Sequence, residues 1–181
     1  KNNNNKMHTH LLFIFIFHCY IGLSLVFAEG ALTLPPNDSN DVSSLLSIKS
    51  TLIDPADHLS DWKVPIKGSD TGPFHCKWTG VSCNSNGYVE KLDLSNMNLS
   101  GRVSDRIQGL HSLAYLNICC NGLSSELPNS LSNITSLKSI DVSQNNFIGG
   151  FPGGPGRASG LKSMNASRNR GRENRGKCGV W

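Results

Sequence analysis

A spacing of 24 residues runs through the middle of the chain and constrains its fold more than any other feature. Four short blocks begin 24 residues apart without a gap: Leu92-Asp93-Leu94, Leu116-Asn117-Ile118, Ile140-Asp141-Val142 and Met164-Asn165-Ala166. The same step relates Val89, Leu113, Leu137 and Leu161, then Leu99, Leu123 and Phe147, then Val103, Leu127 and Phe151. Because a repeat this short cannot bury its apolar side chains alone, we expect the repeats to stack into a solenoid with one continuous core.

Asparagine, glycine and proline recur in the same register. Asn121, Asn145 and Asn169 follow the apolar blocks, and Met97 occupies this place in the first repeat. An asparagine amide can hydrogen-bond the backbone of the turning chain and of neighbouring coils. Glycine and proline recur further along the repeat, at Gly101, Gly149, Pro128 and Pro152. The whole pattern resembles the leucine-rich repeat, L-x-x-L-x-L-x-x-N-x-L, in the plant-type form that continues L-x-G-x-(I/L/F)-P.

A helix is expected ahead of the repeats. Asn40 or Asp41 can cap it, and its apolar positions lie on one side, at Val42, Leu45, Leu46, Ile48, Leu52 and Ile53. Asp54-Pro55 is expected to end the helix, because a residue before proline disfavours helical geometry.

The run Cys-Lys-Trp-Thr-Gly-Val-Ser-Cys at residues 76–83 follows this helix. It resembles the amino-terminal cap of plant leucine-rich-repeat proteins. The resemblance implies a disulfide between Cys76 and Cys83, and it implies that Trp62 and Trp78 shield the first coil. The implied fold is an α/β solenoid of three plant-type repeats and part of a fourth, behind a disulfide-bearing helical cap.

The amino-terminal segment is predicted to direct the chain into the secretory pathway. We expect translation to start at Met7, and residues 11–28 are almost wholly apolar. The end of this segment favours cleavage by signal peptidase between Ala28 and Glu29. A membrane anchor needs about 20 apolar residues, and this segment is shorter. The prediction is an exported mature chain without a membrane span, in an oxidising compartment.

Five parts follow from these features. They are a leader and signal peptide at 1–28, a linker at 29–40, the cap at 41–86, the repeats at 87–169 and a basic non-repeat tail at 170–181. The apolar register ends after Asn169, where Gly171 and Glu173 replace the expected residues. Between Glu29 and Ser167, ten basic side chains face twelve acidic ones, so no basic patch predicts nucleic-acid binding.

From about Asp41 to Asn169 the chain looks like the start of a plant leucine-rich-repeat receptor-like kinase, and it is most similar to the phloem-intercalated-with-xylem-like group. The resemblance implies a truncated ectodomain of such a receptor, which is an extracellular or cell-surface module that binds a secreted peptide or protein, with a co-receptor as a further candidate partner. One alternative is a free-standing secreted repeat protein, such as a wall-enzyme inhibitor or a decoy. Another is a truncated gene copy without function.

In solenoids of this kind the inner face offers solvent-facing strand positions to a ligand. The alternative is that these positions are merely solvated. The candidate ligand-facing residues are Lys91, Asp93, Ser95, Tyr115, Asn117, Cys119, Ser139, Asp141, Ser143, Ser163 and Asn165.

No enzyme, cofactor or metal is predicted, because no nucleophile, base and orienting group stand at a credible spacing. The acidic stretch with Asp54, Asp57, His58 and Asp61 fits no ligand pattern and is interpreted as a polar turn. His75 beside Cys76 lacks further zinc ligands. The glycines of residues 149–160 are not followed by the Gly-Lys-Ser/Thr of a phosphate-binding loop.

Cysteines and sequons complete the list of candidate modification sites. Removal of Cys19 with the signal peptide leaves five cysteines, so at least one is unpaired or pairs outside the chain. Cys119 and Cys120 stand where other repeats have Ser-Asn or Ser-Gln, and adjacent cysteines rarely bridge one another comfortably. A bond from one of them to Cys178 or to another molecule is the alternative. N-glycosylation sequons lie at Asn37, Asn98, Asn133 and Asn165.

Overall fold

The computed structural model of the chain describes residues 39–65, 73–153 and 160–170. The chain divides into two compact units, Lys1–Leu34 and Pro35–Trp181, and every described residue belongs to the second unit. The predicted signal peptide, most of the predicted linker, Asn37, Cys178 and the tail from residue 171 onward lie outside the described residues.

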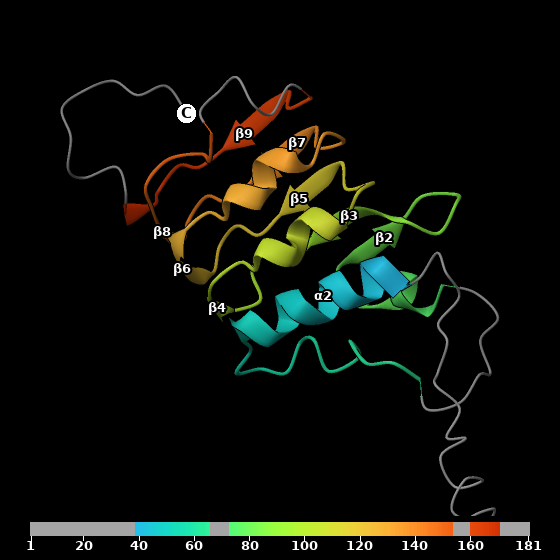
Figure 1. Ribbon diagram of the computed structural model, residues 1–181. Helices are drawn as coiled ribbons and strands as arrows, with labels where there is room; N and C mark the ends of the chain where they lie inside the picture. Colours follow the sequence, from blue (N-terminus) through green and yellow to red (C-terminus); the bar gives the residue numbers. More distant parts are fainter. Residues whose placement is uncertain (1–38, 66–72, 154–159, 171–181) are drawn as a thin grey trace, which may run out of the picture. The chain divides into compact units, whose positions relative to one another are not determined.

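A five-stranded sheet forms one face of the solenoid (Figure 1). Its strands lie in the order β2 (Val81–Cys83), β3 (Val89–Asp93), β5 (Tyr115–Asn117), β7 (Ser139–Asp141) and β9 (Ser163–Asn165). Strand β2 is antiparallel to β3, and the remaining neighbours are parallel. The register pairs Leu92 with Leu116, Leu116 with Ile140 and Ile140 with Met164. The 24-residue spacing is therefore confirmed as the step from one strand to the next.

A second sheet, which the sequence pattern did not predict, contains one strand from the cap and one further strand from each of the first three coils. Its order is β1 (Leu52–Ile53), β4 (Ser100–Gly101), β6 (Gly122–Glu126) and β8 (Asn146–Ile148). Strand β1 is antiparallel to β4, and the other pairs are parallel. These strands are too short and too polar to show the alternating apolar pattern that predicts a strand. They form because neighbouring coils pair with each other.

Short helices occupy the other side of the coils. The 3₁₀ helices η2 (Asp105–Gly109) and η3 (Asn129–Asn133) pack next to each other, and η2 packs against the cap helix α2 (Ser39–Thr51). Figure 1 shows these helices stacked in front of the five-stranded sheet. Each 3₁₀ helix buries one apolar side chain, Ile107 in η2 and Leu131 in η3. Sheet and helices thus enclose the core from two sides.

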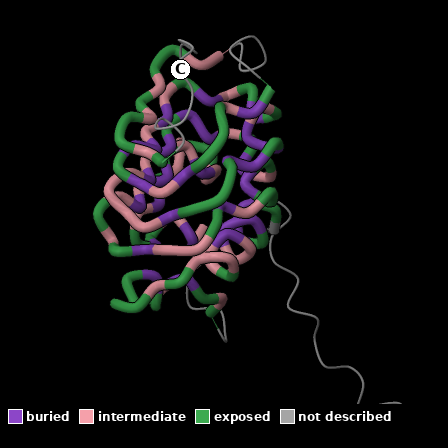
Figure 2. Tube along the Cα trace, turned by 90° about the vertical axis from the view of Figure 1, so that its left-hand side faces the viewer, coloured by how far each residue is buried: buried purple, intermediate pink, exposed green. Residues whose placement is uncertain are grey.

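The core is a continuous row of apolar side chains, and buried segments recur along successive coils (Figure 2). The last described coil is less buried, since Leu161 and Met164 are only half-buried. The residues of the row that are at most 2% exposed include Val89, Leu92, Leu94, Leu99, Leu113, Leu116, Leu123, Leu137 and Ile140.

The cap covers the first coil with the helix α2 and a pair of tryptophans. The Trp62 and Trp78 rings stack with centroids 5.7 Å apart, and both side chains are buried. The Trp62 indole nitrogen donates a hydrogen bond to the Thr79 carbonyl at 2.9 Å. Asp41 of α2 accepts a hydrogen bond from the Val89 backbone N–H at 2.8 Å, which ties the cap to the first repeat strand. The predicted solenoid with a helical, disulfide-bearing cap is therefore confirmed.

The predicted bounds of the cap helix are wrong at both ends. The helix begins at Ser39, so Asn40 and Asp41 lie inside it instead of capping it. It ends at Thr51, and Leu52–Ile53 forms strand β1. Pairing of β1 with β4 satisfies the backbone of these two residues, and this tertiary pairing overrides the helical pattern. Ile53 is 62% exposed as a result, although the helical pattern placed it on the apolar side.

The asparagine after each inner strand connects neighbouring coils. The Asn121 Oδ1 accepts hydrogen bonds from the backbone N–H groups of Met97 and Leu99 in the preceding coil, at 3.1 and 2.9 Å. Its Nδ2 donates to the carbonyl of Leu94 at 2.8 Å and to that of Cys119 at 3.0 Å. One side chain therefore hydrogen-bonds backbone groups of two neighbouring coils. The chain turns too sharply here for these backbone groups to pair with each other.

The same contacts recur one and two coils later. Asn145 accepts from the Leu123 N–H at 3.0 Å and donates to the Ile118 carbonyl at 2.8 Å. Asn169 accepts from the Phe147 N–H at 3.0 Å. We call Asn121, Asn145 and Asn169 the asparagine ladder.

Replacing the buried member of the asparagine ladder should destabilise the fold strongly. Asn145 is only 6% exposed. Asn145→Ala would leave one N–H and several carbonyls without a partner, so we expect a loss of about 3 kcal/mol in the free energy of unfolding. The exposed Asn129→Ala is the control, with an expected change below about 0.5 kcal/mol. Denaturant unfolding of both variants measures the difference, and equal stabilities would contradict a structural role for the ladder.

The glycine of the plant-type pattern is replaced by Ser125 in the second repeat, and this replacement is strained. Ser125 has a φ of 75°, in the same left-handed region as its counterparts Gly101 and Gly149, whose φ values are 96° and 73°. Non-glycine residues are disfavoured in this region by about 1 to 2 kcal/mol. Ser125→Gly should therefore raise the free energy of unfolding, by about 0.5 to 1 kcal/mol after the chain-entropy cost of glycine. Ser124→Gly is the matched control and should lower it, so a stability loss in both variants would refute the strain.

Candidate ligand-binding face

The strand register arranges the candidate ligand-facing residues in rows across the coils. One row runs through Lys91, Tyr115, Ser139 and Ser163, and the next runs through Asp93, Asn117, Asp141 and Asn165. Neighbouring members of a row lie on strands about 4.8 Å apart. The row of Leu92, Leu116, Ile140 and the half-buried Met164 lies between them and points to the core, because alternate strand residues point to opposite faces. We call these solvent-facing rows, with the residues two positions after the second row, the inner face.

Exposure differs along the inner face. Lys91, Ser163 and Asn165 are exposed, and Tyr115 is 44% exposed. With the exception of Ser143, the remaining predicted positions are half-buried. They are Asp93, Ser95, Asn117, Cys119, Ser139 and Asp141.

Ser143 was predicted to face a ligand, and the structure corrects this prediction. Its side chain is only 3% exposed, so it does not offer a surface to a ligand. The Ser143 Oγ donates to Asp141 Oδ1 at 2.6 Å, and it lies 3.2 Å from the donating Asn165 Nδ2. These contacts and the coil above cover the hydroxyl, so Ser143 supports the face and does not form it.

Acidic and amide side chains on the inner face also hold the turn after each strand. Asp93 Oδ1 accepts from the backbone N–H and hydroxyl of Ser95, at 3.2 and 2.7 Å. Asp141 makes the same pair of contacts with Ser143, and Asn117 accepts from the Cys119 N–H. The second row therefore has a structural role in addition to its position on the face.

Asp93 carries a stable negative charge. Burial alone would raise the pKa of its carboxyl, but the hydrogen bonds from Ser95 and the nearby Lys91 outweigh burial and lower it. The Lys91 ammonium lies 3.2 Å from Asp93 Oδ2. Because the folded-state pKa is lowered, the contribution to stability is complete above the unfolded pKa and is lost only as the pH falls through the folded value. The inner face therefore keeps this charge in mildly acidic surroundings.

Two exposed basic residues stand beside the first row of the inner face and were missed from the sequence. Lys138 and Lys162 are exposed and stand one position before Ser139 and Ser163. Their backbones are linked, since the Lys162 N–H donates to the Lys138 carbonyl at 2.8 Å. The 24-residue step that relates them to each other was the signal that could have identified them. The face thus presents lysines on one side of its carboxylates.

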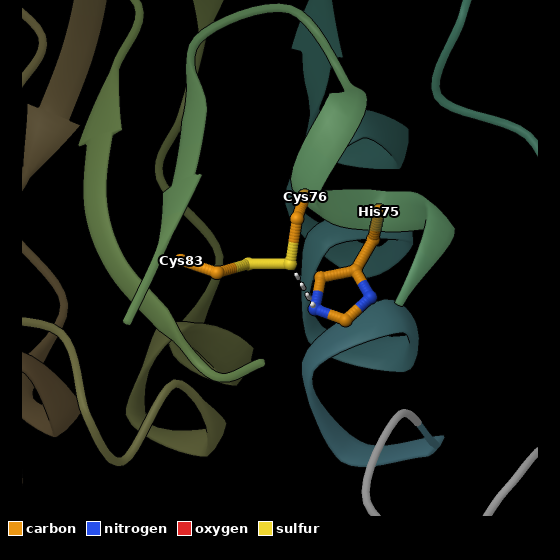
Figure 3. A group of neighbouring side chains, drawn as sticks. All are labelled: His75, Cys76 and Cys83. Atoms are coloured by element: carbon orange, nitrogen blue, oxygen red, sulfur yellow. Dashed lines mark hydrogen bonds between the residues drawn. A yellow bond between two sulfur atoms is a disulfide. The ribbon is translucent and has the colours of Figure 1, made fainter. Parts of the chain in front are cut away.

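The cap contains the predicted disulfide between Cys76 and Cys83, with Cα atoms 5.5 Å apart (Figure 3). His75 lies beside it, with Nε2 3.7 Å from Cys76 Sγ. These three residues have potential ligand atoms within 4.8 Å of one another. A metal would need thiolates, however, and both sulfurs are committed to the disulfide. The group is therefore a structural element of the cap.

The acidic stretch after the cap helix fastens loops, in agreement with its interpretation as a turn. Asp54 Oδ2 accepts from the Leu59 N–H at 2.8 Å. Asp61 Oδ2 accepts from the backbone N–H and the hydroxyl of Thr79, at 2.6 and 3.0 Å. Asp57 takes a left-handed conformation with a φ of 55°. Carboxylates that accept backbone hydrogen bonds in this way hold a turn in place.

Comparison with known families matches both parts of the described chain. The leucine rich repeat N-terminal domain matches residues 38–84, and the leucine rich repeat matches residues 112–134. The MDIS1-interacting receptor like kinase 1 of Arabidopsis thaliana is 48% identical over 68% of this chain, which spans 11% of that relative. The leucine-rich repeat receptor-like protein kinase TDR of the same plant is 38% identical over 60% of this chain, which spans 9% of it.

Solved ectodomains have the same fold. The BIR2 ectodomain from Arabidopsis thaliana superposes with a TM-score of 0.65 at 34% identity, over 72% of this chain and 68% of that one. The BIR3–SERK2 complex from the same plant gives a TM-score of 0.63 at 31% identity, over 71% and 69%. The PEPR1–AtPEP1 structure gives 0.63 at 28% identity, over 72% of this chain and 18% of that one.

The fold and the cap define a plant-type leucine-rich-repeat ectodomain module. The chain belongs to the leucine-rich-repeat receptor-like kinase family of plants, which it matches over the ectodomain region. It spans about a tenth of the length of the curated relatives above. Within the described ranges, no helix is both long and apolar enough to cross a bilayer.

The three predicted sequons within the described residues differ in environment. Asn98 is exposed with a φ of 52°, and Asn133 is exposed at the end of η3. Asn165 lies on strand β9, where its Nδ2 donates to Asp141 Oδ2 at 3.0 Å. A glycan is attached through this nitrogen, and on β9 it would have to fit onto the inner face.

We therefore expect glycans on Asn98 and Asn133 and none on Asn165. Asn98→Gln and Asn133→Gln should each lower the mass of the secreted chain by one glycan. Asn165→Gln should leave the mass of the attached glycan unchanged. Intact-mass measurement before and after glycosidase treatment distinguishes these cases, and a glycopeptide containing Asn165 would contradict the assignment.

Proposed function

We propose that the chain supplies the first coils of an extracellular, cell-surface ectodomain and that its inner face binds an extended peptide or a protein loop. The observation that carries this proposal is the pair of in-register solvent-facing rows, one with the half-exposed Tyr115 and the other with the charged Asp93. The asparagine ladder holds these side chains at fixed spacing, so little entropy is lost when a partner binds.

Relatives support the kind of partner. The PEPR1–AtPEP1 structure and the BIR3–SERK2 complex pair similar ectodomains with AtPEP1 and with SERK2. By analogy, a secreted peptide is the proposed ligand, and a second repeat ectodomain is the proposed co-receptor. The match of residues 38–84 to the leucine rich repeat N-terminal domain supports a role as the amino-terminal part of such an ectodomain.

Charge and shape suggest what the ligand offers. Tyr115 supplies apolar area and a hydroxyl on a rigid strand, which is typical of binding hot spots. The neighbouring strand β7 carries Ser139 and Asp141, and Lys138 stands immediately before it. A ligand with an apolar side chain next to a basic group, and with an acidic group farther along, would complement this arrangement.

A peptide-display selection tests the proposal. The secreted chain would be the bait for a library of random peptides, and enriched peptides would be measured against variants. We expect Tyr115→Ala to weaken binding at least about tenfold, because truncation of a central aromatic typically costs more than 1.4 kcal/mol. The control is Arg106→Ala, an exposed residue of η2, which should bind as the unmodified chain does.

Two results would count against binding at the inner face. One is a set of enriched peptides that bind the Tyr115→Ala variant fully but lose affinity for the Arg106→Ala variant. The other is a selection that enriches no peptide, while thermal unfolding shows that the bait is folded.

A further inference from the structure

Cys119 and Cys120 form a pair of adjacent thiols at the end of strand β5. Their Sγ atoms lie 2.9 Å apart, and both residues are free cysteines that are half-buried. The equivalent residues are Ser95 and Asn96 one coil earlier, and Ser143 and Gln144 one coil later. Among the first three coils, the second therefore has two thiols where the other two have a hydroxyl and an amide.

The fold does not explain this replacement. The Ser95 hydroxyl donates to the aspartate of its coil, whereas Cys119 contributes its backbone N–H to Asn117 Oδ1. Cys120 has a φ of 61°, a left-handed conformation that asparagine, present at Asn96 with a φ of 56°, adopts far more readily than cysteine. Hydrogen bonding in the turn and the backbone conformation both favour other residues, and the feature that distinguishes this coil is the contact between two sulfur atoms.

We propose that Cys119 and Cys120 are a redox-responsive modification site, which converts reversibly between a dithiol and an adjacent-residue disulfide by exchange with a low-molecular-weight disulfide. The Cys120 thiolate attacks one sulfur of that disulfide, forms a mixed disulfide and releases one small thiol after proton uptake. Cys119 then loses its proton, attacks the Cys120 sulfur and displaces the second small thiol. The protein loses two electrons and two protons, and the small disulfide is reduced to two thiols.

The surroundings of Cys119 make the exchange dependent on pH. Burial, then the hydrogen bond and charge of Cys120, and then the charges of Asp141 and Asp93, raise the pKa of Cys119 to about 12. Cys119 therefore keeps its proton at neutral pH in the dithiol, which leaves Cys120 to attack first. The contribution of the Cys120 charge disappears once that sulfur is in the mixed disulfide. Because only the thiolate attacks, the second step should become faster as the pH rises.

Ring closure should strain the solenoid. Adjacent Cα atoms are about 3.8 Å apart, which is shorter than the usual range for bridged cysteines. The backbone here is tied to both neighbours, since the Cys119 carbonyl accepts from the Asn96 N–H at 3.1 Å and the Cys120 N–H donates to the Ser143 carbonyl at 3.0 Å. The bond closes no long loop, so it constrains the unfolded chain little. The oxidised form should therefore be easily reduced and less stable than the dithiol.

The experiment uses the full secreted chain with Cys178→Ser, so that Cys119 and Cys120 are the thiols that remain beside the cap disulfide in the mature chain. Oxidised glutathione is added at several pH values, and free thiols, peptide masses and the Tm are followed. We expect both thiols to be lost, faster at higher pH, with no glutathione retained in the end product and with a lower Tm that a mild reductant restores. Asp141→Asn removes one nearby charge and should accelerate the loss.

The matched control carries Cys119→Ser and Cys120→Asn, which recreates the pair of the first coil. It should show no thiol loss and no change in Tm on oxidation. Two persistent thiols, glutathione retained as the end product, or a disulfide between two chains would each overturn the proposal. These readouts require no ligand, so they are independent of binding at the inner face.

Discussion

The asparagine ladder is the interaction on which the positions of the other groups depend. Each amide bonds the backbone of its own coil and that of the preceding coil, as Asn121 does with Cys119 and Leu94. A coil that turns this tightly cannot pair all its backbone groups within itself, and these groups are shielded from water. The ladder therefore sets how neighbouring coils stack. It consequently keeps Asp93, Asn117 and Asp141 in one row on the inner face.

The ladder also explains the departure at Met97. Each ladder asparagine serves the coil before it, and the element before the first coil is the cap. There the cap backbone just before the antiparallel strand β2 contacts the first coil, with the Asp93 N–H donating to the Gly80 carbonyl at 2.8 Å. Gly80 has a φ of 77°, and a Cβ there would lie 2.3 Å from that Asp93 carbonyl oxygen. An asparagine is therefore not needed at position 97, whereas a glycine is needed in the cap.

Repetition made most of the fold predictable. A residue such as Leu116 could be assigned to the core because the same environment recurs at Leu92 and Ile140, and each repeat serves as a control for the others. Features without a repeat were harder to predict. The end of the cap helix was misplaced because Leu52 fits the helical pattern and pairs with β4 only in the folded chain. Ser143 was assigned to the face although neighbouring coils cover it.

By itself the sequence determined the solenoid and its register, because periodic apolar residues are buried when the coils stack. The cap and its disulfide were implied by the family resemblance of the cysteine and tryptophan run. Only the tertiary structure decided which inner-face positions are accessible, that each coil contributes to a second sheet, and that the sulfurs of Cys119 and Cys120 touch. These properties depend on contacts between coils 24 residues apart in sequence. Such contacts are set by backbone stacking and local φ values, which the identity of a residue does not specify.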